Sequence, residues 1–225
     1  MIEPQLTPEI SYKGLPKTLD YPWDEWDVQQ YFYFLPEPFP EDVRDLTPRA
    51  SWALTLAILE WVDVFFSRFS DDKSLEQYIL AGWVGIIDRD RCEHINTDDE
   101  DWRGPVRGPL QLSLAIIAEM FFVNSDDRTA VAYAIFAENL ARHVIPNDSP
   151  FFDWLVFSKE RLNRWHSYTA EDPAPEPLFA EHFYLGNVVS RSIFNSNLDY
   201  SPDSAEIEIQ KLVEVNPRSP FLKQS

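Results

Sequence analysis

The sequence predicts an all-α protein: a single domain of about six to eight helices, built from stacked antiparallel helical hairpins. Three observations favour this fold class. Long apolar segments recur at helical spacing. Glycine is scarce, with 6 in 225 residues, and the 18 prolines cluster outside the long apolar segments. Finally, a degenerate internal repeat relates residues 52–87 to residues 110–144.

The repeat is visible in two pairs of matching segments. The apolar segment 54–58 returns at 112–116, and Ser-Asp-Asp-Lys at 70–73 returns as Ser-Asp-Asp-Arg at 125–128. A helix pair of this kind cannot bury its apolar face alone, so successive pairs usually stack. We therefore expect one helical hairpin in each copy, and we expect the two hairpins to pack together.

Residues 1–46 precede the first hairpin and have a different composition. Segment 21–34 combines many aromatic side chains with carboxylates, and Pro36, Pro38 and Pro40 then force extended backbone. We expect a proline-rich N-terminal arm that its aromatic side chains hold against the helical domain. The alternative is a recognition surface, because Trp and Tyr often anchor protein interfaces.

The helical domain is expected to span residues 47–215. The Thr-Pro pair at 47–48 predicts a helix start, with a side-chain oxygen at the N-cap and proline at the first helical position. The following helix is apolar on most sides, and only Glu60, Asp63 and Ser67 define a polar stripe. A helix of this character belongs at the centre of a domain.

The remaining chain predicts a third helix pair over residues 150–194, whose second helix starts near Leu178. A short helix follows from Ser201, although the alternation over 206–209 also fits an edge strand. Residues 216–225 are expected to form a loose C-terminal tail.

Charge and cysteine content narrow the function classes. The chain has 38 acidic and 19 basic residues, a net charge of −19, which disfavours nucleic acids and anionic membranes as partners. Such a protein is either merely soluble or suited to a basic partner. Cys92 is the single cysteine, the N-terminus lacks signal-peptide features, and the longest apolar run carries charges. We expect a cytoplasmic protein.

Motifs for catalysis are not found in the sequence. There is no phosphate-binding glycine loop or nucleophile elbow, and Cys92 with His94 is too small a ligand set for zinc. The best enzymatic signal is the Asp pairs at 71–72 and 126–127, because facing acidic clusters can hold Mg²⁺. Each pair also stands where a helix begins, where a carboxylate caps free N–H groups, and we favour that structural role. We therefore assign no catalytic, metal or cofactor-binding residue.

Two acidic segments also contain tryptophan, and they supply our candidate partner-binding residues. The first lies in the arm and consists of Trp23, Asp24, Glu25, Trp26 and Asp27. The second lies in the loop between the two hairpins and consists of Asp98, Asp99, Glu100, Asp101 and Trp102. Carboxylates beside an aromatic anchor suit docking onto a basic cleft.

The leading hypothesis is a non-enzymatic bacterial immunity protein that inhibits a cognate secreted toxin or effector by direct binding. A nuclease-like toxin fits best, because its basic cleft would attract an acidic inhibitor. The alternatives are a phage-type DNA mimic that antagonises a nucleic-acid-binding protein, and an all-α Mg²⁺-dependent hydrolase. The sequence leaves open which toxin is bound, how it is blocked, and whether the inhibitor is a homodimer.

Overall fold

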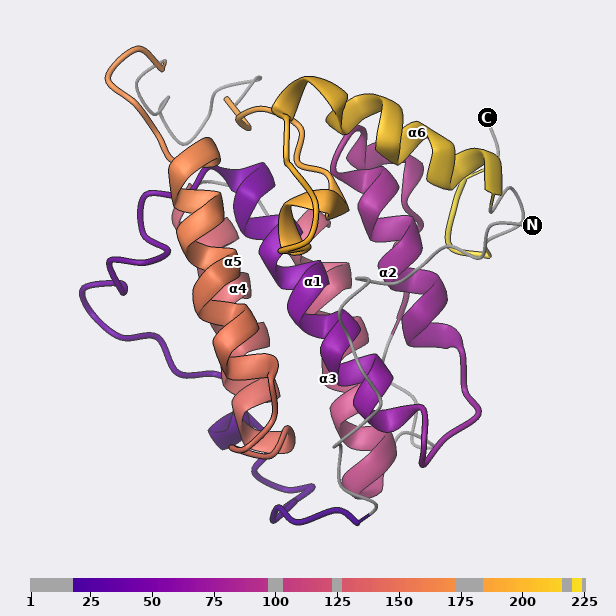
Figure 1. Ribbon diagram of the computed structural model, residues 1–225. Coiled ribbons are helices and arrows are strands. Elements are labelled where there is room, and N and C mark those ends of the chain that lie inside the picture. The colour runs from indigo at the N-terminus through magenta and orange to yellow at the C-terminus, as the bar shows by residue number, and fades with distance from the viewer. Residues whose placement is uncertain (1–17, 97–102, 123–126, 173–183, 216–219, 224–225) are drawn as a thin grey trace.

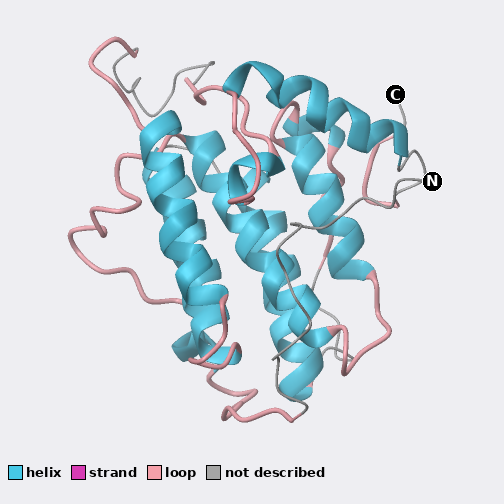
Figure 2. Ribbon diagram, in the orientation of Figure 1, coloured by secondary structure: helices cyan, strands magenta, loops and turns pink. Residues whose placement is uncertain are grey.

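The computed structural model describes residues 18–96, 103–122, 127–172, 184–215 and 220–223, and its regular secondary structure there is helical (Figures 1 and 2). The α-helices are α1 (Pro48–Phe66), α2 (Ser74–Gly85), α3 (Gly104–Phe122), α4 (Asp127–Val144), α5 (Phe151–His166) and α6 (Ala205–Val215). Four short 3₁₀ helices are η1 (Val28–Tyr31), η2 (Arg89–Arg91), η3 (Arg191–Phe194) and η4 (Pro202–Ser204). The predicted all-α fold class is confirmed.

Helix α1 is the centre of the domain, as predicted. It starts at Pro48 with Thr47 as its N-cap residue, and every residue of the helix except Arg49 is buried. α1 contacts α2, α3, α4 and α5, and α2 runs beside it in the opposite direction (Figure 1). The expected polar stripe is wrong in one respect: Glu60 and Asp63 are buried, because neighbouring elements cover this side of the helix too.

The first four helices occupy the residues of the two predicted hairpins. Sequence neighbours α1 and α2 are in contact, as are α3 and α4, yet the most extensive contact of α1 is with α4. α3 also packs against both α1 and α2. The four helices therefore share one core, and the proposed repeat stays a prediction from the sequence.

The third predicted helix pair is wrong in its second helix. α5 forms as expected, and part of the segment from Leu178 lies outside the described residues, but residues 184–190 are irregular and lead into η3. Gly186 has a φ of +80°, and a β-carbon there would lie 2.4 Å from the Thr47 hydroxyl oxygen. This close approach and the left-handed backbone exclude a regular helix at that point.

Arginine side chains hold this irregular segment in place. Arg49 in the first turn of α1 donates hydrogen bonds to the carbonyl oxygens of Ile86, Ile87 and Gly186. The bonds satisfy carbonyls just beyond the end of α2 and tie residue 186 to the core.

Arg161 of α5 fixes the next part of the chain in the same way. Its guanidinium donates to the carbonyl oxygens of Ile193, Asn195 and Leu198. The backbone polar groups of this segment are thus paired with side chains in place of intrahelical partners.

The C-terminal part agrees with the prediction of a short helix, and the edge-strand alternative is wrong. α6 lies across one end of the other helices, and Ala205 and Ile209 are buried (Figure 1). Residues 220–223 correct the expectation of a loose tail. Phe221 packs against Tyr78 at 5.0 Å between ring centroids, and its carbonyl accepts a hydrogen bond from the backbone N–H of Glu93.

Within the described ranges, no helix has the length and hydropathy needed to cross a bilayer.

Candidate partner-binding surface

The described part of the N-terminal arm packs where α3 begins and α4 ends. Tyr21 donates its hydroxyl proton to the carbonyl oxygen of Pro105, in the first turn of α3. At the other helix, Nε2 of His143 donates to the carbonyl oxygen of Pro22 over 2.8 Å. These bonds attach the arm immediately before the first predicted binding segment.

Trp23 is a packed residue of this segment. Its indole lies against Gly108 of α3, where a β-carbon would come within 2.4 Å of the ring. The other neighbours are Tyr31, stacked at 5.0 Å between centroids, and His143, which stacks on Tyr31 at 4.1 Å. Only glycine at position 108 leaves room for this indole.

Residues 24–27 form a tight turn, hereafter the Asp24–Asp27 turn. The N–H of Asp27 donates to the carbonyl of Asp24 at 3.3 Å, and the N–H of Trp26 donates to the Asp24 carboxylate at 2.9 Å. The N–H of Asp24 itself donates to the hydroxyl oxygen of Tyr31 at 2.6 Å. An aspartate that binds the backbone two residues later is a common turn former, and here it fixes the geometry around Trp26.

Glu25 connects the turn to α3. Its Oε1 accepts a hydrogen bond from the backbone N–H of Gly104, the first residue of that helix, and a second from the Trp23 indole at 3.1 Å. A carboxylate at a helix N-terminus pairs a free N–H group and complements the helix dipole. Glu25 therefore has a structural role.

In contrast to Glu25, the side chains of Trp26 and Asp27 have no structural role and are exposed. The Trp26 side chain is 93% exposed, the largest value among the exposed apolar residues of the described chain. Asp27 precedes η1 without capping it through its side chain, and it is also exposed. Of the five predicted arm residues, Trp23, Asp24 and Glu25 thus build the turn. Trp26 and Asp27 are exposed on it.

The second predicted segment, Asp98–Trp102, lies outside the described residues. Whether it contributes to binding stays a prediction.

Two displayed residues were missing from the predicted set, Tyr33 at 62% and Phe34 at 68% exposure. Asn139 of α4 holds their backbone by donating to the carbonyl oxygens of Phe32 and Phe34 at 3.0 and 2.9 Å. One face of the Tyr33 ring stacks on Phe136 at 4.9 Å between centroids. The run of aromatic residues at 31–34 indicates this surface in the sequence. The spacing of these residues does not indicate which of their rings are exposed to solvent.

The described arm is strongly acidic. Residues 18–46 contain eight acidic residues and one basic residue, Arg44. Of the eight, Asp42 is bound to Lys159 of α5 at 2.8 Å, and the same ammonium group binds Glu138 of α4 at 2.6 Å. The acidic charge of the arm therefore partly fastens it to the helices and partly surrounds Trp26.

Two carboxylates that the Mg²⁺ alternative could use, Glu60 and Asp72, have structural partners. Glu60 is completely buried and lies 2.8 Å from the Trp83 indole nitrogen and 3.1 Å from Arg191. The Asp72 carboxylate accepts a hydrogen bond from the N–H of Ser74, the first residue of α2. Across the described ranges, no group of three or more His, Cys, Asp or Glu side chains is placed to hold a metal ion.

Two buried groups have strongly shifted pKa values. Burial raises the pKa of Asp63 to about 7, with a further contribution from the nearby carboxylate of Glu76. Burial also raises the pKa of the Cys92 thiol to about 12, and its Sγ donates to the carbonyl oxygen of Ala81. A thiol with this pKa stays protonated at neutral pH, which makes it a poor nucleophile.

Comparison with known proteins finds no significant match among protein-family models, curated proteins or solved structures.

Proposed function

We propose that this protein is a non-enzymatic acidic inhibitor that binds a basic protein, in the manner of a bacterial immunity protein that neutralises a secreted toxin. The proposed partner is nuclease-like, because a cleft that binds nucleic acid carries the positive charge that this chain would attract. Charge complementarity would speed association, and aromatic contacts would slow dissociation.

One observation carries this proposal: Trp26 is 93% exposed on a turn whose backbone is fixed by hydrogen bonds. Exposing an indole on a monomer forgoes about 2 kcal/mol or more of hydrophobic stabilisation. Tryptophan is also among the residues most enriched at the energetic centres of interfaces. A rigid turn lowers the entropy that binding would cost.

The surroundings of Trp26 support a basic partner in particular. The indole is flanked in sequence by three exposed acidic residues, Asp24, Glu25 and Asp27. Exposed charges of one sign act over about 8 Å at physiological ionic strength, so they favour a partner of opposite charge before contact is made.

The test is capture of the tagged, intact protein from its native host at about 150 mM and about 500 mM salt, which shortens the Debye length severalfold. The comparison is between the unchanged protein, Trp26→Ala with Asp27→Ala, and a matched control, Trp165→Ala. Among the tryptophans that the structure describes, Trp165 on α5 is the next most exposed, at 43%. We expect the unchanged protein and the Trp165 variant to capture one basic protein, in a smaller amount at high salt. The variant with Trp26→Ala and Asp27→Ala should capture less of this protein.

The captured protein is then purified and its own activity is measured with increasing inhibitor. Stoichiometric loss of a toxic enzymatic activity supports an immunity function, while loss of sequence-specific nucleic-acid binding would instead favour the DNA-mimic alternative. A partner that keeps full activity when saturated, or capture that is equal for the Trp26 and Trp165 variants, would contradict the proposal.

A further inference from the structure

Three arginines in the described part of the chain are bound in the same way, each by one aromatic ring and one carboxylate. The sets are Arg191 with Trp83 and Glu60, Arg142 with Phe152 and Glu138, and Arg128 with Phe39 and Glu37. Each guanidinium carbon lies between 5.2 and 5.9 Å from the centre of its ring. Guanidinium suits this arrangement, because its flat face stacks on a ring while the N–H donors at its edge stay free to bind a carboxylate.

One of these sets belongs to the N-terminal arm. Glu37 and Phe39, two residues apart in the arm, hold Arg128 from the first turn of α4. The guanidinium carbon lies 5.2 Å from the centre of the Phe39 ring. The side chains of the ion pair are 68% exposed for Arg128 and 65% exposed for Glu37. The arm therefore binds an arginine with a ring and a carboxylate even on the surface of the molecule.

Trp26 and Asp27 present the same two groups without an arginine. The indole is 93% exposed, and no described cation lies over it. The Asp27 carboxylate does not cap η1, and it forms no hydrogen bond or ion pair with another described residue. The two residues are adjacent, so their Cα atoms are about 3.8 Å apart. One guanidinium group can therefore reach both side chains.

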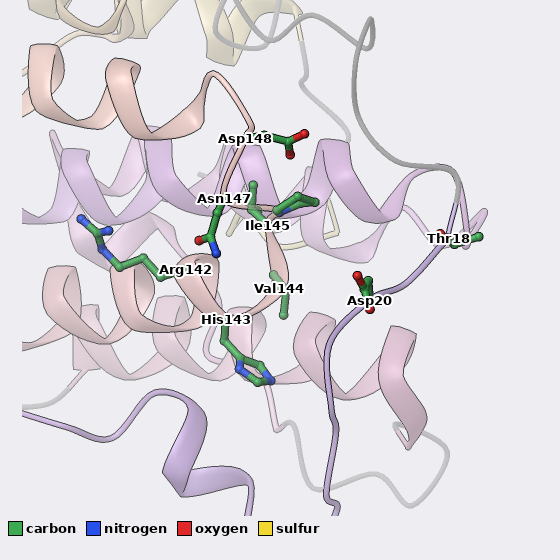
Figure 3. A pocket seen from close by; sticks show the side chains of 9 residues that line it. Thr18, Asp20, Arg142, His143, Val144, Ile145, Asn147 and Asp148 are labelled. Carbon is green, nitrogen blue, oxygen red and sulfur yellow. The ribbon is translucent and has the colours of Figure 1, made fainter.

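The segment that carries this pair is held at both ends by one residue of α4. Nε2 of His143 binds the carbonyl oxygen of Pro22 at 2.8 Å, and the same imidazole stacks on Tyr31 at 4.1 Å between centroids. His143 lies in the last turn of α4, on the wall of a cleft beside the arm (Figure 3). Residues 22–31 therefore form a closed loop that contains the Asp24–Asp27 turn. A loop fixed in this way lowers the entropy that binding would cost.

The charge of the arm favours a cation at this position. Residues 18–46 contain eight acidic residues and one basic residue. An anionic group of a partner would be repelled, and an apolar side chain would bury Asp27 without a counter-charge. The compact ammonium group of lysine could bind the carboxylate, but it has no flat face to stack on the indole. Arginine satisfies both groups.

We propose that the basic partner places an arginine side chain against Trp26 and Asp27, stacked on the indole and bound to the carboxylate. This inference rests on the proposed function and deepens it, because it names the partner group that the inhibitor recognises. The partner supplies to this pair what Arg128 supplies to Phe39 and Glu37 within the chain. The contact is directional, so it adds specificity to the general attraction of the acidic arm.

The first test uses a small probe and the intact protein labelled with fluorotryptophan. N-acetyl-L-arginine amide is titrated at constant ionic strength while the ¹⁹F signal of each indole is followed, in parallel with the corresponding lysine and citrulline amides. Citrulline has nearly the shape of arginine without its charge. We expect the Trp26 signal, assigned by its loss in Trp26→Phe, to shift most with arginine, less with lysine and not with citrulline. The Trp165 signal should shift less, because Arg164 already lies over that ring at 5.6 Å.

Substitution of the carboxylate shows whether it takes part. Asp27→Asn should weaken binding of the arginine amide at Trp26 about threefold, as expected for the loss of an exposed ion pair. The matched control is Asp20→Asn, which removes one exposed carboxylate elsewhere in the arm and should leave this binding unchanged. Equal weakening by both variants, equal shifts with arginine and citrulline, or equal shifts of the Trp26 and Trp165 signals would overturn the assignment.

The second test separates this inference from the proposed function. Each surface arginine of the captured partner is changed to lysine, which keeps the charge. One such change should weaken binding about tenfold, by about 1.4 kcal/mol, and it should have a smaller effect when the inhibitor carries Asp27→Asn. If Trp26→Ala weakens capture but no arginine-to-lysine change does, the inhibitor proposal stands and the arginine inference is wrong. If the probe binds but no basic partner is captured, the inference of a partner arginine falls together with the inhibitor.

Discussion

The same hydrogen bond occurs in two regions of this molecule with different consequences. In the core, the Trp83 indole donates to Glu60 at 2.8 Å, and both residues are completely buried. In the arm, the Trp23 indole donates to Glu25 at 3.1 Å on the exposed surface. A carboxylate in the core needs a cation as well, and Glu60 has Arg191 at 3.1 Å. The Glu25 carboxylate in the arm is exposed to solvent and needs no such cation.

This difference shows how one set of residue types serves two purposes. Carboxylates and indoles in the core specify how α1, α2 and η3 fit together, since an unpaired charge there would be costly. In the arm the same groups build a turn at little cost, which leaves Trp26 and Asp27 available for a partner. Substitutions in the core pair should therefore change the free energy of unfolding much more than substitutions in the arm.

Glu60→Gln should destabilise the protein most, by about 3–5 kcal/mol, because it leaves the largely buried Arg191 guanidinium without its counter-charge. Urea unfolding at pH 7 measures this change. Adding Arg191→Met to Glu60→Gln should recover part of the loss. A single variant within 1 kcal/mol of the unchanged protein would show that this pair is not important for the core.

Asp63→Asn should stabilise the protein at high pH. The folded-state pKa is about 7 and the unfolded value is about 4, so between these pH values the unfolded state has lost a proton that the folded state keeps. The free energy of unfolding therefore falls as pH rises through this window. At pH 8 the variant should be more stable by about 2–4 kcal/mol, with little difference at pH 4.

Urea unfolding across pH 4–8 checks this prediction, and Asp71→Asn is its control. Asp71 is exposed in the connection that follows α1. If both variants show the same pH profile, then the burial of Asp63 is not the cause of the effect.

Glu25→Ala should cost only about 0.5–1 kcal/mol, because it removes a carboxylate from the start of α3 where water can replace it. Thermal unfolding measures the change, with Asp27→Ala as a neighbour that lacks such bonds and should lie within about 0.5 kcal/mol of the unchanged protein. A loss of several kcal/mol for Glu25→Ala would mean that the arm is as essential to the fold as the core pair.

Trp26→Ala should have the smallest effect on stability, within about 0.5 kcal/mol, since the indole has almost no contacts to lose. Trp23→Ala should destabilise more, because that indole packs against Gly108 and Tyr31. If the order is reversed, Trp26 packs in solution and cannot be the displayed anchor.

Local sequence features predicted much of the fold. The Thr-Pro pair located the start of α1, and its apolar residues on most sides indicated the central position. The burial of Glu60 could not be predicted, because it depends on Trp83 and Arg191, which are distant in sequence. The irregular backbone of residues 184–190, where a helix was expected, has a similar cause: Arg49 of α1 binds the carbonyl of Gly186.

The sequence predicted which segment forms the candidate surface, but it did not predict which residues of that segment are packed and which are exposed. Composition pointed to residues 23–27, where indoles and carboxylates alternate. Which of them is packed depends on Gly104 and Gly108 at the start of α3 and on His143 at the end of α4. These contacts join distant parts of the chain, and no local pattern encodes them.

Three partly buried arginines have an evolutionary consequence. Arg49 and Arg161 each satisfy three backbone carbonyls, and Arg191 pairs with Glu60 inside the domain. Lysine has no planar fork of donors and cannot replace them at these sites. Selection for a more acidic surface can therefore remove exposed cations but should keep these three arginines, together with the buried Lys159 that binds Asp42 and Glu138. In diverged relatives, the arginines at these three positions should be conserved more strongly than the acidic residues of the arm. A search for such relatives should therefore use these arginines as its pattern.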